Sequence, residues 1–288
     1  MASSTRSHPS TLALQRRSTG LPLAPHYLPS LPRPLDAPPA IEHIWRPRSF
    51  NALAVAQSKG GHADGSTTLA LAFDSGTASS GSLIVVAFSI YRPGGHSIAV
   101  NDNKGNTYVE VTGASISGAS VVTSIWYCEN ASGGSGHTVT ITDNSGAEFH
   151  GAALEITGAL TSGALDKANA QDDASDTTPH TGSTGTLTQA DEIVVIVTGN
   201  YTNGTGLSGI AVDGGWTQVS EHLNPTFQPG EVDYQIVSAT TALEGGWTIS
   251  GVTASWVSAI ASFKAASGGG GGSSIAAIEH AYRQRRVA

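Results

Sequence analysis

The sequence offers few reactive or charged side chains. Of its 288 residues one is a cysteine, Cys128, and charged residues make up 12%. A single cysteine excludes an intrachain disulfide framework and a zinc site built from several thiolates. No apolar run reaches the roughly 18 residues of a membrane-spanning helix, so no membrane is expected as a partner. Hydrophobic residues nevertheless make up 39% of the chain, which is enough for a sizeable core and argues against wholesale disorder.

Sequence signatures of catalysis are missing as well. The chain contains no G-x-S-x-G, no H-E-x-x-H, no Walker loop and no dinucleotide-binding glycine fingerprint. Its ten histidines are scattered, and no pair has metal-ligand spacing on a recognisable element. Cys128 follows two aromatic residues and is expected to be a small buried hydrophobe rather than a nucleophile. The sequence therefore predicts a protein that is not an enzyme and holds no cofactor or metal.

The net charge of −8 is distributed unevenly along the chain. Segments 1–50 and 273–288 are rich in arginine and basic, whereas the segment 51–272 between them is strongly acidic. An acidic body disfavours nucleic acid as a partner, because the phosphates would be repelled. The basic ends suit an acidic protein surface, such as a neighbouring copy of the same body. The alternative is that they are merely polar segments that happen to contain arginine.

Residues 1–50 contain nine of the 13 prolines. Proline lacks a backbone donor and fixes φ, so an extended arm is expected here instead of a helix or an inner strand. Apolar residues recur between the prolines, as they would in an arm that wraps a neighbour and becomes ordered on contact. A transit peptide is the alternative for the Ser- and Arg-rich start. The residues predicted to bind the partner are Leu21, Leu23, Tyr27, Leu28, Leu31, Ile41, Ile44, Trp45, Arg46 and Phe50.

From residue 51 to 266 the pattern changes to short β-branched runs separated by Gly, Asn, Asp and Ser, which indicates an all-β body. The runs at 83–88 and 193–197 are continuously apolar, so both are expected to be central strands covered on both faces. The run at 137–142 alternates, with Val139 and Ile141 predicted to face inward. Helix periodicity is absent throughout this region.

The body repeats itself at an offset of about 108 residues. The matched pairs occur in the same order: SLIVVAF with DEIVVIV, IAVNDNKGNTYVEV with IAVDGGWTQV, TSIWYCEN with EVDYQIVS, HTVTIT with GGWTIS, and HGAALEITGA with SAIASFKAA. Either two similar sandwiches pack together, or two Greek-key halves form one jelly roll. Because each half has few strands and few large residues, one antiparallel, jelly-roll-like β-sandwich is favoured. Its half-repeats are expected at about 66–159 and 182–266, joined by a crossover at about 158–185.

A Gly/Ser linker at 267–274 leads to a second predicted arm, 275–288. Its apolar residues share one face of a short helix, and its arginines suit the helix C-terminus. A helix of this length is marginal alone in water, so it is expected to dock on a partner. The residues of this arm predicted to bind the partner are Ile275, Ile278, Tyr282 and Arg285.

The crossover contains four aspartates, Asp166, Asp172, Asp173 and Asp176. Carboxylates can bind calcium where a turn brings them together. Their spacing does not match an EF-hand loop, however, so a solvated acidic loop is the expectation.

The strings SGSLIVVAFSI, VNDNKGNTYVEV, SIWYCEN, GHTVTIT and WVSAIASFK resemble β-sandwich proteins found in the virions of tailed bacteriophages. The resemblance covers residues 66–265 approximately and leaves out both arms. It implies a structural role, such as capsid decoration, cement, or a head or tail appendage, and it implies no catalytic residues. The expected function is therefore that of a decoration or cement protein in the virion. Its arms would bind the major capsid protein, other virion subunits or neighbouring copies of itself.

The alternative is a glycan-binding or host-recognition module of the kind found in tail fibres and cell-surface adhesins. It requires an exposed row of aromatic side chains, for which the candidates are Trp126, Trp216, Trp247 and Trp256. Two of these, Trp216 and Trp247, align with strand positions expected in the core, which favours packing over sugar stacking. An enzyme on a jelly-roll scaffold is a third possibility, but the sequence contains no recognisable acid–base pair.

Overall fold

The structure is a computed structural model of the whole chain, and it describes residues 52–74, 77–91, 97–117, 120–200, 206–223 and 229–266. Within these ranges the chain forms β-strands and no helix, so the all-β prediction is confirmed. The strands of the first half are β1 (Ala54–Ala72), β2 (Thr77–Ala78), β3 (Ser82–Tyr91), β4 (Ile98–Asp102), β5 (Val109–Ser117), β6 (Val121–Ala131), β7 (Gly134–Ser135) and β8 (Thr138–Thr157). The strands of the second half are β9 (Leu165–Asp176), β10 (Asp191–Asn200), β11 (Gly209–Val212), β12 (Thr217–His222), β13 (Gly230–Ser238), β14 (Trp247–Ser250) and β15 (Ala254–Lys264).

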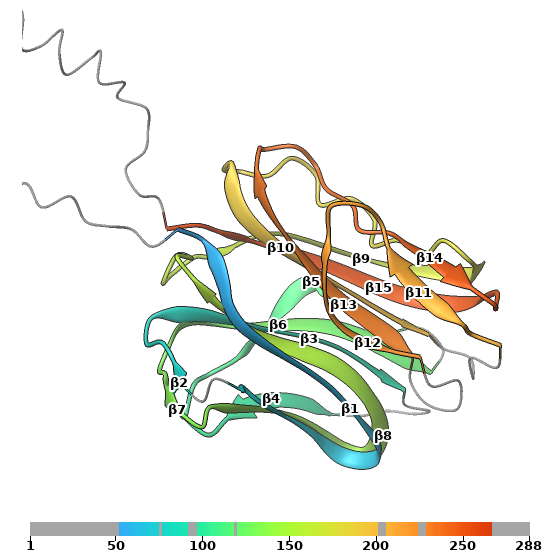
Figure 1. Cartoon of the computed structure of the whole chain (residues 1–288), viewed down its shortest axis with the longest axis horizontal. Helices are drawn as coiled ribbons and strands as arrows, with labels where there is room; N and C mark the ends of the chain where they lie inside the picture. The colour runs from blue at the N-terminus through green and yellow to red at the C-terminus, as the bar shows by residue number, and fades with distance from the viewer. Residues whose placement is uncertain are drawn as a thin grey trace, which may run out of the picture. The chain divides into compact units, whose positions relative to one another are not determined.

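Two large antiparallel sheets form the centre of the body (Figure 1). The first has the strand order β1-β8-β3-β6-β5, and the second has the order β12-β13-β10-β15-β9. The long strand β8 begins in an outer layer, where its residues 138–143 pair with β4 and with the end of β1. In the second half β11 and β14 pair with each other and form the corresponding outer layer.

The two large sheets have the same topology. Counted from one edge, β1, β8, β3, β6 and β5 correspond to β9, β15, β10, β13 and β12. The register corresponds too, since Val85 pairs with Tyr127 and Val195 pairs with Tyr234, and all four contact the same core. The sequence match of SLIVVAF with DEIVVIV instead aligned Val85 with Val194, which faces the opposite side of its sheet. A shift of one residue reverses the face of a strand, so that alignment was one residue out.

Three hydrophobic clusters lie between the layers. The middle cluster joins the large sheets and includes Val85 and Val195. The outer cluster of the first half contains Phe149, and the outer cluster of the second half contains Trp256. The fold therefore differs from the single two-layer sandwich expected from the sequence. The physical reason is that β3 and β10 are buried on both faces, as their apolar runs predicted, so each large sheet has a core on either side.

The predicted crossover at about 158–185 is also more ordered than expected, because it contains β9. This strand pairs along β15 and forms an edge of the second large sheet. Its polar sequence suits an edge strand, where one row of backbone groups remains available to water. The predicted arm 1–50, the linker 267–274 and the helix 275–288 lie outside the described residues.

Candidate functional site

The residues predicted to bind a partner all belong to the two arms and lie outside the described part of the chain. They are Leu21, Leu23, Tyr27, Leu28, Leu31, Ile41, Ile44, Trp45, Arg46, Phe50, Ile275, Ile278, Tyr282 and Arg285. What the structure does describe is the part of the body to which these arms are connected.

The two ends of the body lie side by side. Ala54, at the start of β1, pairs with Thr157. Only one residue further along, Gly158 accepts a 2.7 Å hydrogen bond from the backbone N–H of Ala266, the last residue described. Figure 1 shows the start of β1 and the end of β15 next to each other. Both arms are therefore connected to the same end of the body.

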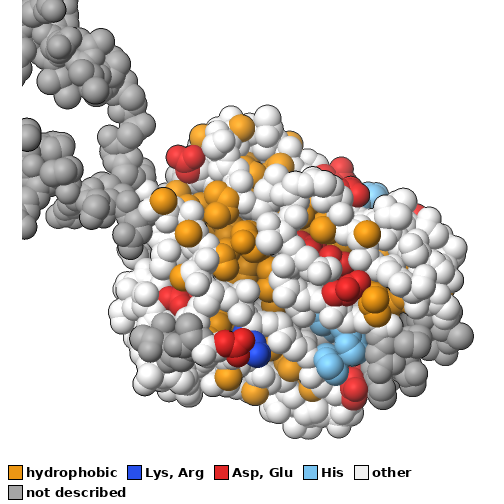
Figure 2. Space-filling view, in the orientation of Figure 1, with side chains coloured by type: hydrophobic (Ala, Val, Ile, Leu, Met, Phe, Trp, Pro, Cys, Tyr) orange, Lys and Arg blue, Asp and Glu red, His pale blue; other side chains and the backbone are white. Residues whose placement is uncertain are grey.

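The surface of the body exposes few large apolar side chains. Figure 2 shows a strip of hydrophobic side chains on one face. In the described residues, however, the exposed large hydrophobic side chains are those of Val109 in β5, which is 52% exposed, and Ile236 in β13, which is 45% exposed. These two belong to different sheets, and the other hydrophobic side chains on the described surface are small or partly buried.

The tryptophans of the body belong to its cores. Trp247 and Trp256 are almost fully buried in the outer cluster of the second half, and Trp216 packs against that cluster. Trp126 is half-buried against the outer cluster of the first half. The expectation of a core position is confirmed for Trp247, whereas Trp216 is only partly buried. The described surface offers no exposed aromatic row for sugar stacking.

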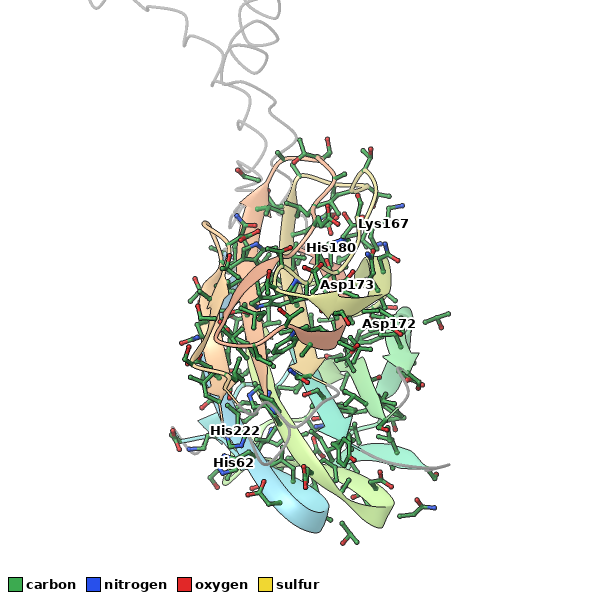
Figure 3. All side chains as sticks on the ribbon, turned by 90° about the vertical axis from the view of Figure 1, so that its right-hand side faces the viewer. His62, Lys167, Asp172, Asp173, His180 and His222 are labelled. Atoms are coloured by element: carbon green, nitrogen blue, oxygen red, sulfur yellow. The ribbon has the colours of Figure 1, made fainter. Side chains whose placement is uncertain are left out.

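Three histidines come together, although the sequence suggested that all of them were scattered. His62, His150 and His222 lie on β1, β8 and β12, at the junction of the two halves, with the rings of His62 and His222 stacked. Figure 3 shows His62 and His222 side by side and His180 apart from them, near Asp173. No sequence spacing could indicate this cluster, because its members are brought together only by strand pairing and by packing between the halves.

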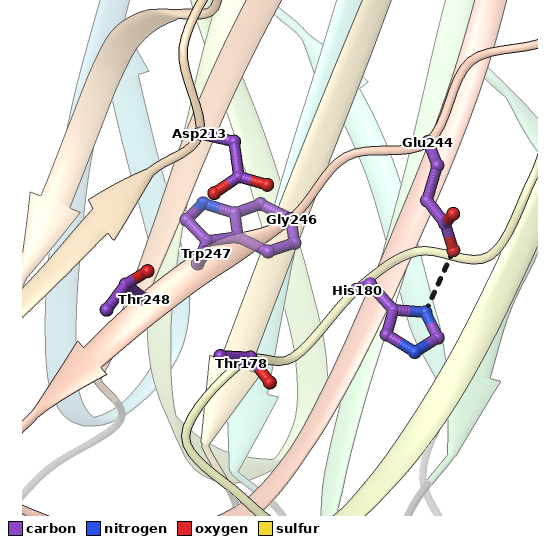
Figure 4. Close-up of a pocket in the computed structure, with 7 residues that line it drawn as sticks. All are labelled: Thr178, His180, Asp213, Glu244, Gly246, Trp247 and Thr248. Atoms are coloured by element: carbon purple, nitrogen blue, oxygen red, sulfur yellow. Dashed lines mark ion pairs between the residues drawn. The ribbon is translucent and has the colours of Figure 1, made fainter.

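A polar pocket of about 360 Å³ opens on the outer face of the second half (Figure 4). Its volume is at the small end of the range for ligand pockets. An ion pair of 3.0 Å joins His180 Nδ1 to Glu244 Oε1 on one side, and Figure 4 shows the Asp213 carboxylate beside the indole of Trp247. The residues lining it are Thr178, His180, Asp213, Glu244, Gly246, Trp247 and Thr248. Such a pocket can accept a small polar molecule through carboxylates, hydroxyls and an imidazole.

A buried pair of carboxyl groups is linked to the wall of this pocket. Trp247 Nε1 donates a 2.9 Å hydrogen bond to Asp233 Oδ2, and Gln218 Nε2 donates one of the same length to Glu231 Oε1. Both carboxyl groups are fully buried. Burial, followed by the neighbouring Glu231, raises the pKa of Asp233 to about 9, so at neutral pH Asp233 is protonated. The sequence contains no recognisable acid–base pair. The side chains of Asp233 and Glu231 are fully buried, so a substrate could not contact them.

In the first half, buried polar side chains around Asp102 hold a turn in place. His137 Nε2 lies 2.7 Å from Asp102 Oδ2, and neither side chain is exposed. Asp102 also accepts hydrogen bonds from Tyr108 and Asn106, which fixes the turn after β4. Cys128 is buried as expected, and this burial raises the pKa of its thiol to about 11, which makes it a poor nucleophile.

Three of the four aspartates of the crossover accept hydrogen bonds from residues around them, and the fourth, Asp172, is exposed. Asp166 accepts a 2.7 Å hydrogen bond from the backbone N–H of Thr188, and Asp173 accepts one of 2.9 Å from His180. Asp176 accepts hydrogen bonds from the two backbone N–H groups that follow it. Across the described ranges, no group of three or more His, Cys, Asp or Glu residues is arranged to hold a metal ion.

Comparisons with protein-family models, with curated proteins and with solved structures give no match. In the described part of the chain there is no helix long and apolar enough to cross a membrane.

Proposed function

We propose that this chain is a structural protein of a tailed-bacteriophage virion, a decoration or cement protein that attaches to the capsid through its terminal arms. We also propose that the body is an internal duplication in which each half is a small jelly-roll-like sandwich. The matching strand order and register of the two large sheets support that origin.

One observation carries the attachment model: both arms join the body at the same end, beside Thr157 and Gly158. An anchor at one end leaves the remainder of the body free to project from a surface. Two arms at opposite ends would instead suit a protein that bridges two partners through its long axis.

The distribution of apolar and charged residues supports the same model. The described body exposes few large apolar side chains, whereas the two arms contain many apolar residues and a net positive charge. Arms that bind in extended form contact a large area for their length, although their ordering costs free energy. Two linked arms on one body raise each other's effective concentration, so individually weak contacts combine into stable attachment.

Two steps test this proposal, and the first is composition. Virions of the phage that encodes the chain are purified and their proteins quantified by mass spectrometry, and immunogold labelling with an antibody against the body locates the chain. We expect a copy number in proportion to the capsid lattice and labelling of the particle surface. Absence from purified virions would overturn the proposal.

The second step tests the arms. Particles that lack the chain are mixed with purified full-length chain, either unchanged or with Tyr27→Ser, Trp45→Ser and Tyr282→Ser combined. We expect the unchanged chain to restore full occupancy and the arm variant to remain unbound. The matched control is V109S/I236S, which changes the exposed apolar residues of the body and is expected to bind normally. Equal binding of all three proteins would contradict attachment through the arms.

The pocket beside His180 favours a second candidate function, that of a host-recognition module that binds a glycan. Its carboxylates and hydroxyls could accept hydrogen bonds from sugar hydroxyls, although the buried tryptophans offer no stacking surface. A glycan array probed with full-length chain tests this candidate. Binding that D213N/E244Q abolishes would support it, and an array without hits would eliminate it.

A further inference from the structure

The junction between the two halves contains a cluster of three imidazole rings. His62 of β1 and His150 of β8 are direct partners across their paired strands, and His222 of β12 comes from the other half. The ring of His222 stacks on that of His62, with centroids 4.0 Å apart and an angle of 23° between the planes. It also lies parallel to the ring of His150 at 6.2 Å.

The ring of His150 is buried where a positive charge would not be solvated. His150 is 1% exposed, its Nε2 lies 3.0 Å from Ser220 Oγ, and its Nδ1 has no hydrogen-bond partner among the described residues. At Gly60 and Gly230 the backbone lies so close to the neighbouring residues that there is no space for a Cβ. A Cβ on Gly230 would lie 2.9 Å from His150 Nδ1, and a Cβ on Gly60 would lie 2.4 Å from the Cβ of Ser220. Water could therefore reach His150 only if the junction opened.

Few charged groups are available to balance a proton on these rings. Among the described carboxylates, Asp64 on β1 interacts with His222, and Glu148 on β8 interacts with Asp64. Glu221 and Glu231 are cross-strand neighbours, and they lie on the face of the second sheet that points away from the cluster. The remaining described groups that approach the cluster from β3, β12 and β13 are uncharged: Ser89, Ser220 and Gly230.

The electrostatic consequences of this packing agree with its geometry. Burial and the neighbouring imidazoles lower the pKa of His150 to about 3, and burial followed by His62 also lowers the pKa of His222. A histidine released from the junction would titrate near the ordinary value of about 6.5. The closed junction therefore disfavours protonation of His150 and His222, and the open junction gains stability relative to it as the pH falls below about 6.5.

We infer that the cluster of His62, His150 and His222 is an acid-sensitive latch, which holds the two halves together while its rings are neutral and releases them when the rings take up protons. Two protonated rings stacked at 4.0 Å repel each other, and a protonated His150 must leave its buried position to be solvated. Opening separates β1 from β12 and gives water access to the core that the two halves share.

Hydrogen exchange of the full-length chain tests the latch. Exchange in β1 and β12 is followed by mass spectrometry between pH 7.5 and 4.5, with a chelator present to remove adventitious metal. After correction for intrinsic exchange rates, we expect the opening constant to rise below about pH 6.5, by up to about tenfold per pH unit for each ring excluded from protonation. The double variant H62Q/H222Q is expected to show a shallower dependence than wild type, because of the three rings only His150 then remains to take up a proton. The matched control H180Q, which changes a histidine outside the junction, is expected to retain it.

Two results would overturn the latch. One is a wild-type opening constant that does not change between pH 7.5 and 4.5, and the other is a pH dependence of H62Q/H222Q as steep as that of wild type. If the double variant does not fold, NMR titration of the wild-type histidine ring protons decides the question. Proton uptake by His150 and His222 must coincide with loss of protection in β1 and β12, and uptake while these strands remain protected contradicts the latch.

Discussion

Replacing Asp233 by Asn is expected to stabilise the protein, and increasingly so as the pH rises. Asp233 is fully buried, accepts a 2.9 Å hydrogen bond from Trp247 Nε1 and lies beside the equally buried Glu231. An asparagine keeps an acceptor for the indole and offers an amide donor to Glu231 in place of the proton that Asp233 holds. The variant therefore preserves the contacts and removes only the ionisable group.

The magnitude follows from the protons bound in the two states. The pKa of Asp233 is raised from 3.8 to about 9 by burial and then by the charge of Glu231. Between these values the native state holds a proton that the unfolded state has lost, so the free energy of unfolding decreases as the pH rises. The decrease is about 1.4 kcal/mol per pH unit. The stabilising contribution is complete below pH 3.8 and is lost as the pH rises through 9. Between pH 5 and 8 the advantage of D233N over wild type should grow by up to about 4 kcal/mol.

Urea denaturation of the full-length chain at pH 5, 6, 7 and 8 measures this difference. The control is D172N, which removes an exposed carboxylate from β9 and is expected to change the pH dependence little. A difference in the free energy of unfolding between D233N and wild type that stays constant across this range would refute the argument. So would a D233N variant that is less stable than wild type at pH 8.

Three further predictions concern packing. G60A places a Cβ 2.4 Å from that of Ser220, and overpacking of this kind should cost about 1–3 kcal/mol in urea denaturation; G214A, which meets no atom within 4 Å, should cost much less. The thiol of Cys128, buried and with its pKa raised to about 11, should react slowly with a disulfide reagent at pH 7.5 and rapidly after unfolding in urea; fast labelling of the folded chain would contradict its burial. W256A removes a fully buried indole and should lower the free energy of unfolding by about 3–5 kcal/mol, whereas a loss below 1 kcal/mol would place that residue outside the core.

The central strands could be predicted from the sequence because burial on both faces leaves an unmistakable pattern. The continuous apolar runs of β3 and β10 indicated it directly, and both strands are buried along almost their whole length. The face that each residue occupies could not be read in the same way. Val194 and Val195 are equally apolar and differ only in the core that they contact, so similarity of sequence left the alignment one residue out.

The polar clusters of the body could not be predicted, the histidine cluster because its members are distant in the sequence and the carboxyl pair because its burial leaves no mark in the sequence. His62 and His222 come from opposite halves and meet through packing of the two sheets. Asp233 acquires its raised pKa from burial under Trp247 and from Glu231, two residues away on the same face of β13. Glu231 and Asp233 alternate with Val232 and Tyr234, a pattern that is typical of an amphipathic strand with its carboxylates in water.

Cryo-electron microscopy of the virion tests the account most directly, because it shows the orientation of the body on the particle. We predict that the end carrying Ala54 and Ala266 faces the capsid shell, with ordered density for the arms on neighbouring subunits and the opposite end of the body in solvent. A body that presents this end to solvent would contradict the account, as would arms that are bound to the flanks of their own body.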